Sequence, residues 1–103
     1  MVWKIVFRKR FDSDLDRLRD TRGTDFDIEG LKYAFTFLAE GTPLPGVFGD
    51  HALVDDWAHR REFHLSDDDL IVYQSKPRVQ EIVLMRAGTH EKLFRKRVKH
   101  KKK

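Results

Sequence analysis

The sequence contains no cysteine in its 103 residues. That absence excludes a disulfide framework, a thiolate nucleophile and a zinc site with thiolate ligands. Long apolar runs are lacking too. The apolar stretch from Met1 to Phe7 is far too short to span a bilayer, and it has neither the charged leader nor the small-residue cleavage site of a signal peptide. These absences predict a cytoplasmic protein that makes no contact with a membrane.

Acidic residues are missing from the C-terminus, where residues 95–103 hold seven of the 21 lysines and arginines. The other 14 basic side chains stand against 17 acidic ones, so the chain before this tail has a net charge of −3, compared with +4 for the whole. A dense block of like charges repels itself. We therefore predict a single domain over residues 1–94 and a flexible basic tail over 95–103, which serves either solubility or anchoring on a polyanion.

Local patterns predict a strand and then a helix at the start of the chain. The strand covers residues 2–7 and is apolar on both faces, as in a central strand of a sheet. The helix is capped by Asp12 or Ser13 and ends at Arg22. Its core side has helical spacing, with Phe11, Leu15 and Leu18 facing inward and Asp14, Asp16, Arg17 and Arg19 on the solvent side.

A second helix begins at Asp25 or Asp27 and ends before Gly41, a residue suited to the position after a helix. Its core-facing side chains follow an i, i+3, i+7, i+10 spacing. They are Ile28, Leu31, Phe35 and Leu38, with Ala34 beside them.

The second half of the chain predicts strands over residues 60–65, 70–73 and 81–86, and Thr89 can cap a helical turn over 90–94. In the last strand Ile82, Leu84 and Arg86 share one face. The element order is β-α-α-β-β-β. It predicts an α+β fold in which two N-terminal helices pack on one side of a twisted, mostly antiparallel sheet of four to five strands, with a short C-terminal helix.

Three histidines beside turns, His51, His64 and His90, are accompanied by an acidic triplet at 67–69 and by Arg86. Cleaving RNA without a metal requires a base for the 2′-hydroxyl, an acid for the departing 5′-oxygen and a cation for the phosphorus oxygens. Histidine transfers protons near neutral pH, and arginine supplies a permanent cation with a planar donor fork. These residue types therefore form a plausible phosphodiester-cleaving set.

Each member of this set also has a simpler explanation. A histidine at a strand end is usually a surface residue, three aspartates in a turn are usually solvated turn formers, and Arg86 could pair with Glu62. Three imidazoles and a water also make a catalytic zinc site. However, the sequence lacks the short-range ligand pairs, such as H-x-x-x-H on a helix, that favour a metal.

The order of several motifs resembles the YafQ branch of the RelE/ParE toxin superfamily, whose fold is RelE-like. The resemblance covers residues 44–94 with little gapping. Its motifs are the run from Leu44 to Leu53 (LPGVFGDHAL), Trp57, Arg61-Glu62-Phe63-His64, Asp68, Leu70 to Tyr73 (LIVY), and Arg86 to Phe94 (RAGTHEKLF).

This resemblance implies a toxin of a type II toxin-antitoxin system. Such a toxin is a ribosome-dependent endoribonuclease that cuts mRNA in the ribosomal A site and is held inactive by a cognate antitoxin. Its expected partners are the antitoxin, the ribosome and mRNA. It needs no cofactor and no metal, and it reaches DNA only through the antitoxin.

The resemblance also implies roles for individual residues. Asp68 is the expected general base and His90 the expected general acid. Arg86 stabilises the phosphorane. His51 and His64 orient or protonate the phosphate. The substrate-binding residues are Phe94, which stacks on or positions a base, and Arg61.

One departure from the family concerns the acidic triplet, where relatives commonly carry Pro-Asp-Trp and this chain has Asp67-Asp68-Asp69. The residue that acts as base is therefore open among the three. The lysine-rich tail is a second departure. Alternative functions are a ParE-like toxin that targets gyrase without cutting RNA, a noncatalytic RNA-binding module, and a ribonuclease that acts without the ribosome.

Overall fold

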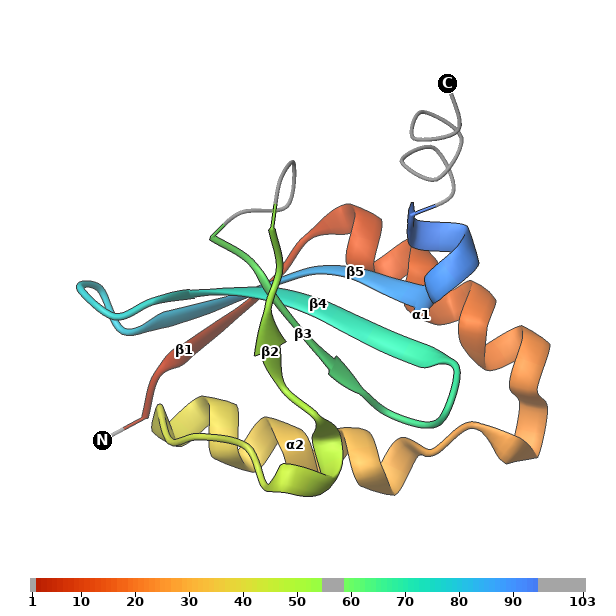
Figure 1. Ribbon diagram of the computed structural model, residues 1–103, viewed down its shortest axis with the longest axis horizontal. Coiled ribbons are helices and arrows are strands. Elements are labelled where there is room, and N and C mark those ends of the chain that lie inside the picture. The colour runs from red at the N-terminus through yellow and green to blue at the C-terminus, as the bar shows by residue number, and fades with distance from the viewer. Residues whose placement is uncertain (1, 55–58, 95–103) are drawn as a thin grey trace.

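The computed structural model describes residues 2–54 and 59–94, and its elements follow the expected order with one added strand (Figure 1). The elements are β1 (Lys4–Phe7), α1 (Lys9–Arg22), α2 (Ile28–Glu40), β2 (His51–Ala52), β3 (Arg61–His64), β4 (Asp69–Lys76) and β5 (Glu81–Thr89), with 3-10 turns at Gly23–Asp25 and Gly46–Phe48. Residues 90–94 form the expected helical turn, where the Lys92 N–H donates to the Thr89 hydroxyl. The predicted α+β class is confirmed. The basic tail, residues 95–103, lies outside the described residues.

The five strands form one sheet in the order β1-β5-β4-β3-β2. Three of its pairings are antiparallel and only β1 with β5 is parallel, so the expected mostly antiparallel sheet is confirmed. The prediction that the first strand is central was wrong, because β1 lies at an edge. Packing beside the sheet explains its apolar residues: the Phe7 ring centroid lies 6.0 Å from those of Phe11 in α1 and Phe35 in α2.

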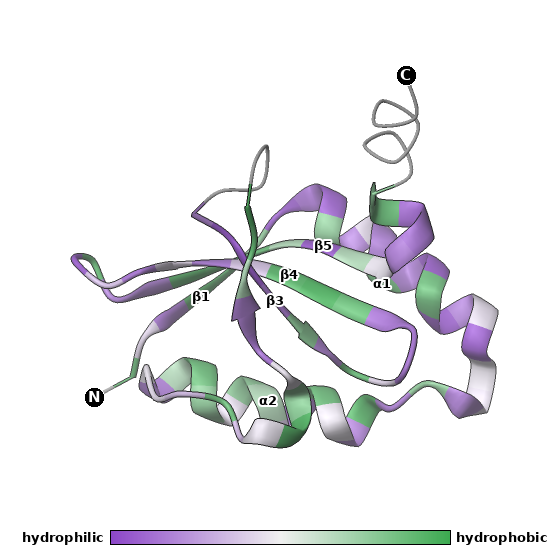
Figure 2. Ribbon diagram, viewed as in Figure 1, coloured by the Kyte–Doolittle hydropathy of each residue, from purple (hydrophilic) through white to green (hydrophobic). Residues whose placement is uncertain are grey.

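The main hydrophobic core lies between the two helices and one face of the sheet. The hydropathy colouring shows apolar stretches along α2 and β4 (Figure 2). Buried side chains of this core include Phe11, Leu18, Leu31, Ala34 and Leu38 from the helices, and Phe63, Ile71, Tyr73, Ile82, Leu84 and Ala87 from the sheet. A smaller cluster on the other face contains Leu70, Val72, Leu93 and Phe94. Within the described ranges, no helix has the length and apolar content needed to cross a membrane.

The ends of α2 follow the sequence prediction. The Asp27 carboxylate accepts from the Gly30 N–H at 2.9 Å, and Gly41 ends the helix with a left-handed φ of 69°. The start of α1 differs from the prediction. This helix begins at Lys9 rather than near Asp12, because the chain turns into it directly from the end of β1.

Candidate active site

Three of the predicted site residues, His51, His64 and Arg86, lie on the sheet face that points away from the helices. Residues paired across neighbouring strands have their side chains on the same face. One row of such pairs crosses four strands and contains His51, Glu62, Val72 and Arg86. The next row contains His64, Leu70 and Gly88. We call the surface formed by these seven residues the open face.

A β-bulge in β5 turns Arg86 toward the open face. Val72 pairs with Arg86 whereas Tyr73 pairs with Leu84, so Met85 is an extra residue in this strand. The extra residue reverses the alternation of side chains beyond it. The regular strand pattern had predicted that Arg86 shares a face with Leu84. This prediction was wrong, because the bulge places the two side chains on opposite faces.

The His51 ring is held between two oxygen atoms. Its Nδ1 lies 2.9 Å from the Gly49 carbonyl oxygen, and its Nε2 lies 3.0 Å from Glu62 Oε2. Both nitrogens face oxygen acceptors, which fix the orientation of the ring. The His64 ring centroid is 6.4 Å away. Glu62, which is buried, thus pairs with His51 and not with Arg86.

Arg86 is bound by the carboxylate of Asp14 in α1, which is only 5% exposed. Arg86 Nε donates to Asp14 Oδ2 at 2.6 Å and Nη2 donates to Oδ1 at 3.4 Å. The Ala87 N–H also donates to Oδ2, at 3.1 Å. Since β1 pairs with β5 only as far as Leu84, Asp14 occupies the edge of β5 beyond the end of β1. This carboxylate fixes both the strand edge and the guanidinium.

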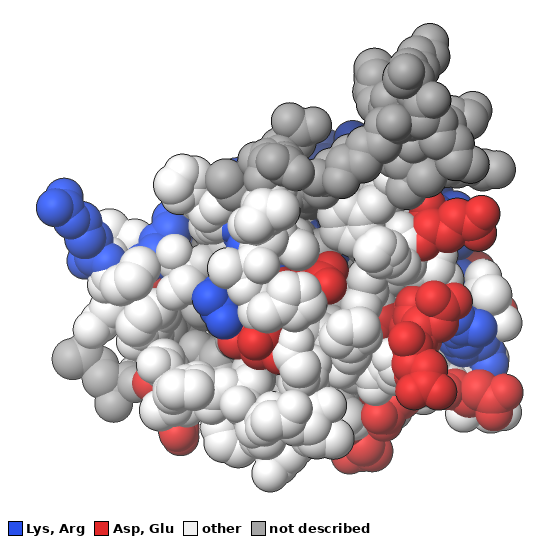
Figure 3. All heavy atoms as spheres, viewed as in Figure 1, with Lys and Arg blue, Asp and Glu red and all other residues white. Residues whose placement is uncertain are grey.

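The acidic triplet divides into one buried and two exposed residues. Asp69 is buried and accepts three hydrogen bonds from Arg22, the shortest at 2.7 Å. The hydrogen bond with Asp69 and its negative charge raise the pKa of the Arg22 guanidinium. Asp68 is 66% exposed, with its Oδ2 4.0 Å from the same guanidinium. Acidic side chains gather on the side of the molecule where this turn lies (Figure 3). Asp67 and Asp68 therefore remain accessible.

His90 stands on the helical turn after β5 and is exposed. Its ring centroid lies 4.9 Å from that of Phe94, which is buried in the small cluster with Leu70 and Val72. Asp69 pairs with Thr89 across β4 and β5, so Asp68 and His90 are the next residues beyond that pair. The structure thus brings the expected base and the expected acid to the same end of the sheet.

Arg61 lies apart from these residues. It pairs across strands with Tyr73, a member of the main core, and its Nε lies 3.2 Å from Asp50 Oδ1. The Tyr73 hydroxyl donates to the same oxygen at 2.8 Å. The hydrogen bond with Asp50 raises the pKa of Arg61, and burial followed by the same acceptor raises the pKa of Tyr73. Arg61 is therefore on the opposite face from His51 and His64.

No three His, Cys, Asp or Glu side chains in residues 2–54 and 59–94 are arranged to hold a metal ion. The rings of His51 and His64 approach one another, whereas the ring of His90 contacts Phe94. The zinc site considered from the three imidazoles has no ligand set among these residues.

Sequence reasoning missed Asp14, which it placed on the solvent side of its helix. The residue follows Phe11 by three positions and precedes Leu18 by four, so it lies in the buried stripe of α1. That spacing was the available signal. The identity of its partner was beyond the pattern, because 72 residues separate Asp14 from Arg86.

Two helices on one face of a mixed five-stranded sheet, with imidazole and guanidinium groups on the other, define a small toxin of the RelE-like class. Residues 3–95 match a family described as "Bacterial toxin of type II toxin-antitoxin system, YafQ". The chain belongs to this YafQ family, as the motif order had predicted.

Known relatives agree with this assignment. The mRNA interferase toxin YafQ of Escherichia coli (strain B / BL21-DE3) is 36% identical over 69 residues, which cover 66% of this chain and 73% of the relative. A copper-bound mutant toxin from Helicobacter pylori has a TM-score of 0.79 at 36% identity, over 89% of this chain and 99% of that one. The toxin in the E. coli DinJ-YafQ complex has a TM-score of 0.75 at 31% identity, over 89% and 98%. The curated names confirm the predicted endoribonuclease class.

Proposed function

We propose that this chain is a ribosome-dependent endoribonuclease that cleaves mRNA in the ribosomal A site by acid-base catalysis without a metal ion. The observation that supports it is the arrangement of the open face. His51, His64 and Arg86 lie in two adjacent rows, and Asp68 and His90 stand exposed at one end of the same strands. Action on translating ribosomes places the protein in the cytoplasm.

In the proposed reaction the Asp68 carboxylate takes the proton of the ribose 2′-hydroxyl, and the 2′-oxygen attacks the adjacent phosphorus. The bond between phosphorus and the 5′-oxygen breaks as His90 gives its proton to that oxygen. The products are a 2′,3′-cyclic phosphate and a 5′-hydroxyl, with one proton gained by Asp68 and one lost by His90. Arg86 offsets the charge that develops on the phosphorus oxygens, and His51 and His64 orient the phosphate.

The geometry favours Asp68 over its neighbour as the base. Asp69 is buried and bound to Arg22 through both oxygens, so it has no free access to a ribose. The Phe94 ring lies in the small cluster and contacts the His90 ring. The proposed role of Phe94 is therefore to position the general acid as well as to contact an RNA nucleobase.

Cleavage of a defined mRNA by the purified toxin, with and without ribosomes, tests the proposal. We expect cleavage with ribosomes only, and we expect His90→Ala to lower the rate by about 100-fold or more, the contribution of a general acid. The variant should keep the wild-type melting temperature, because His90 is exposed. Cleavage of free RNA, retained cleavage by His90→Ala, or inhibition of gyrase without cleavage would each contradict the proposal.

An antitoxin is the proposed partner. The solved E. coli DinJ-YafQ complex, whose toxin shares 31% identity with this chain, supports the assignment. We expect expression of the toxin alone to arrest bacterial growth and co-expression of its antitoxin to restore it. Harmless expression of an intact, folded toxin would contradict the proposal and favour a noncatalytic module.

The basic tail is proposed to add affinity for ribosomal RNA without taking part in the chemistry. Its seven basic residues follow a body with a net charge of −3, so it supplies the positive charge that the rest lacks. Truncation after Phe94 should weaken ribosome association at moderate salt and flatten its salt dependence. An unchanged salt dependence would contradict this role.

A further inference from the structure

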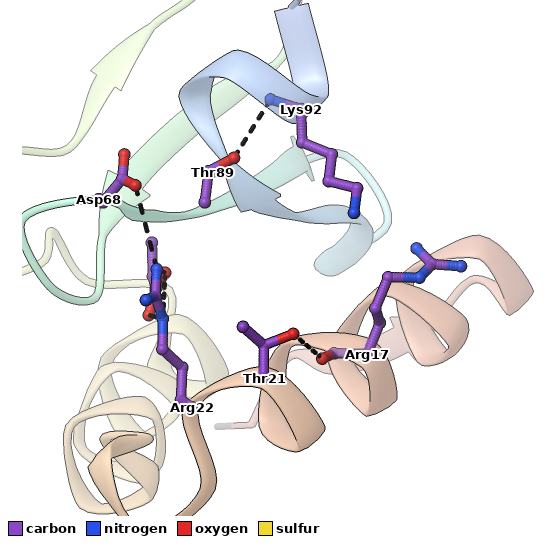
Figure 4. A network of polar contacts seen from close by, with 7 residues as sticks. Arg17, Thr21, Arg22, Asp68, Thr89 and Lys92 are labelled. Carbon is purple, nitrogen blue, oxygen red and sulfur yellow. Dashed lines mark hydrogen bonds and ion pairs between the residues drawn. The ribbon is translucent and has the colours of Figure 1, made fainter.

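A cavity of about 90 Å³ separates α1 from the end of β5 and the helical turn that follows it. Side chains from both sides point into this space: Arg17 and Thr21 from α1, Thr89 from the end of β5, and Lys92 from the turn (Figure 4). Arg22 and Arg86 also line it, and Asp14 is the one carboxylate among its described lining residues. The cavity is therefore rich in cationic donors, and Thr89 adds a hydroxyl donor, whereas the Thr21 hydroxyl already donates to the Arg17 carbonyl oxygen.

The arginine donors of this cavity are held by carboxylates before any ligand arrives. Buried carboxylates contact all three of the lining guanidinium groups: Asp14 binds Arg86 and lies 3.5 Å from Arg17, and Asp69 binds Arg22. Because the Thr89 hydroxyl oxygen accepts from the Lys92 N–H, its own proton stays available for donation. Within the described part of the chain the Lys92 ammonium makes no ion pair. Fixed donors around a space bind an anion without the entropy cost of assembling them.

We propose that this cavity is a phosphate subsite for the RNA chain, bound mainly by Lys92 and Arg17 and additional to the phosphate that is cleaved. Cations and hydroxyls are the usual partners of RNA phosphates, whereas bases are recognised by stacking on aromatic rings. The described lining contains no aromatic residue. The inference rests on the proposed ribonuclease function, because it assigns a further contact to the same substrate.

The position of the cavity fits a phosphate that neighbours the scissile one. Arg86, which lies in the open-face row of His51, also lines the cavity. Arg22 approaches Asp68, the proposed base, at 4.0 Å, and Lys92 follows His90, the proposed acid, by two residues on one helical turn. One RNA strand can therefore engage the cavity and the catalytic residues together.

Titration of the ¹⁵N-labelled full chain with inorganic phosphate tests the cavity itself. We expect saturable shifts of the Thr89 and Lys92 amide signals. Lys92→Gln and Arg17→Gln should each weaken phosphate binding by about threefold to fivefold, as for single exposed charge contacts, and the double variant by about tenfold. Arg78→Gln is the matched control, because Arg78 lies in the β4–β5 turn at the far end of the sheet. Absent shifts, or shifts unaffected by the double variant, would overturn the proposal.

Ribosome-dependent cleavage then tests the RNA assignment. In the double variant Lys92→Gln with Arg17→Gln, KM should rise about tenfold while kcat stays within about twofold of wild type. The slope of log K for RNA binding against log salt concentration should become shallower by about two. An unchanged KM overturns the subsite, and an unchanged KM with weakened antitoxin binding assigns the cavity to an acidic protein instead. A wild-type chain that binds phosphate but cuts no mRNA refutes the nuclease function and leaves the anion site standing.

Discussion

Arg22 and Arg86 are held by carboxylates from distant parts of the chain, whereas the proposed proton-transfer groups stand exposed at one end of the open face. Arg86 is bound to Asp14, and Arg22 to Asp69. By contrast, Asp68 and His90 are exposed. Asp68 lies 4.0 Å from Arg22, and the His90 ring centroid lies 4.9 Å from that of Phe94.

The difference matches the chemistry proposed for each group. A guanidinium stabilises charge only if it is already in position when the charge develops, so a buried carboxylate that holds it contributes to catalysis. A proton donor or acceptor must instead contact the substrate atom directly. His51 lies between these cases, because Glu62 holds a ring that is still half exposed.

The adjacent residues Asp68 and Asp69 give the sharpest test of this comparison. Asp68→Asn should lower kcat by about 100-fold or more, because it removes the base, and leave the melting temperature unchanged. Asp69→Asn should lower the melting temperature by about 5 °C or more, because Arg22 loses its buried partner. Asp67→Asn is the control and should change neither quantity. Equal effects of the three substitutions on cleavage would show that no single aspartate is the base.

Asp14→Asn tests whether a buried carboxylate acts through Arg86. We expect kcat to fall about tenfold with little change in KM, and the free energy of unfolding to fall by about 2 kcal/mol, as when a charged buried hydrogen bond is lost. Asp16→Asn, an exposed change on the same helix, should alter neither.

A double-mutant cycle separates positioning from a general loss of structure. In an Arg86→Ala background, Asp14→Asn should still lower stability but should have no further effect on kcat. Additive effects on kcat would mean that Asp14 does not act through Arg86.

The sequence predicted the helices and strands better than it predicted the partners of each residue. The helix α2 was readable because its apolar spacing, its cap at Asp27 and its terminating Gly41 all agree. The histidines and Arg86 were predicted as site residues from their side-chain chemistry, which does not depend on the fold.

What the sequence could not supply comes from contacts between distant segments. The bulge at Met85 changes the face of Arg86, and it depends on pairing with β4, not on a local signal. The edge position of β1 depends on its parallel pairing with β5. The paired residues Lys4 and Glu81 are 77 positions apart in the sequence. Asp14 sits in the apolar stripe of α1 only because the edge of β5 offers it an amide and a guanidinium.

Glu62→Gln addresses the intermediate case of His51. Glutamine keeps the size and one acceptor oxygen but removes the charge that faces His51 Nε2. We expect kcat/KM to fall about fivefold, since a charge-assisted hydrogen bond is replaced by a neutral one. If Glu62→Gln lowers kcat/KM equally in a His51→Ala background, Glu62 does not act through His51.

The smallest effect is expected at Tyr73, in the cluster with Asp50 and Arg61 on the helix side of the sheet. Tyr73→Phe removes only the hydroxyl that donates to Asp50 at 2.8 Å. The free energy of unfolding at neutral pH should fall by about 1.5 kcal/mol, the lower end of the contribution of a hydrogen bond to a charged group. Cleavage should be unchanged, because the hydroxyl lies on the opposite face from His51 and His64. A loss of activity without a loss of stability would mean that this cluster contacts the substrate.

The stabilising effect of the Tyr73 hydroxyl should also depend on pH. Burial and the Asp50 carboxylate raise its pKa in the folded protein above the value of about 10 that it has in the unfolded chain. The folded state thus retains a proton that the unfolded state releases, so stability from this group is complete below pH of about 10 and declines as the pH rises further. Urea denaturation at pH of about 8 and about 11 should therefore show a smaller difference between wild type and Tyr73→Phe at the higher pH, and a constant difference would rule out this titration.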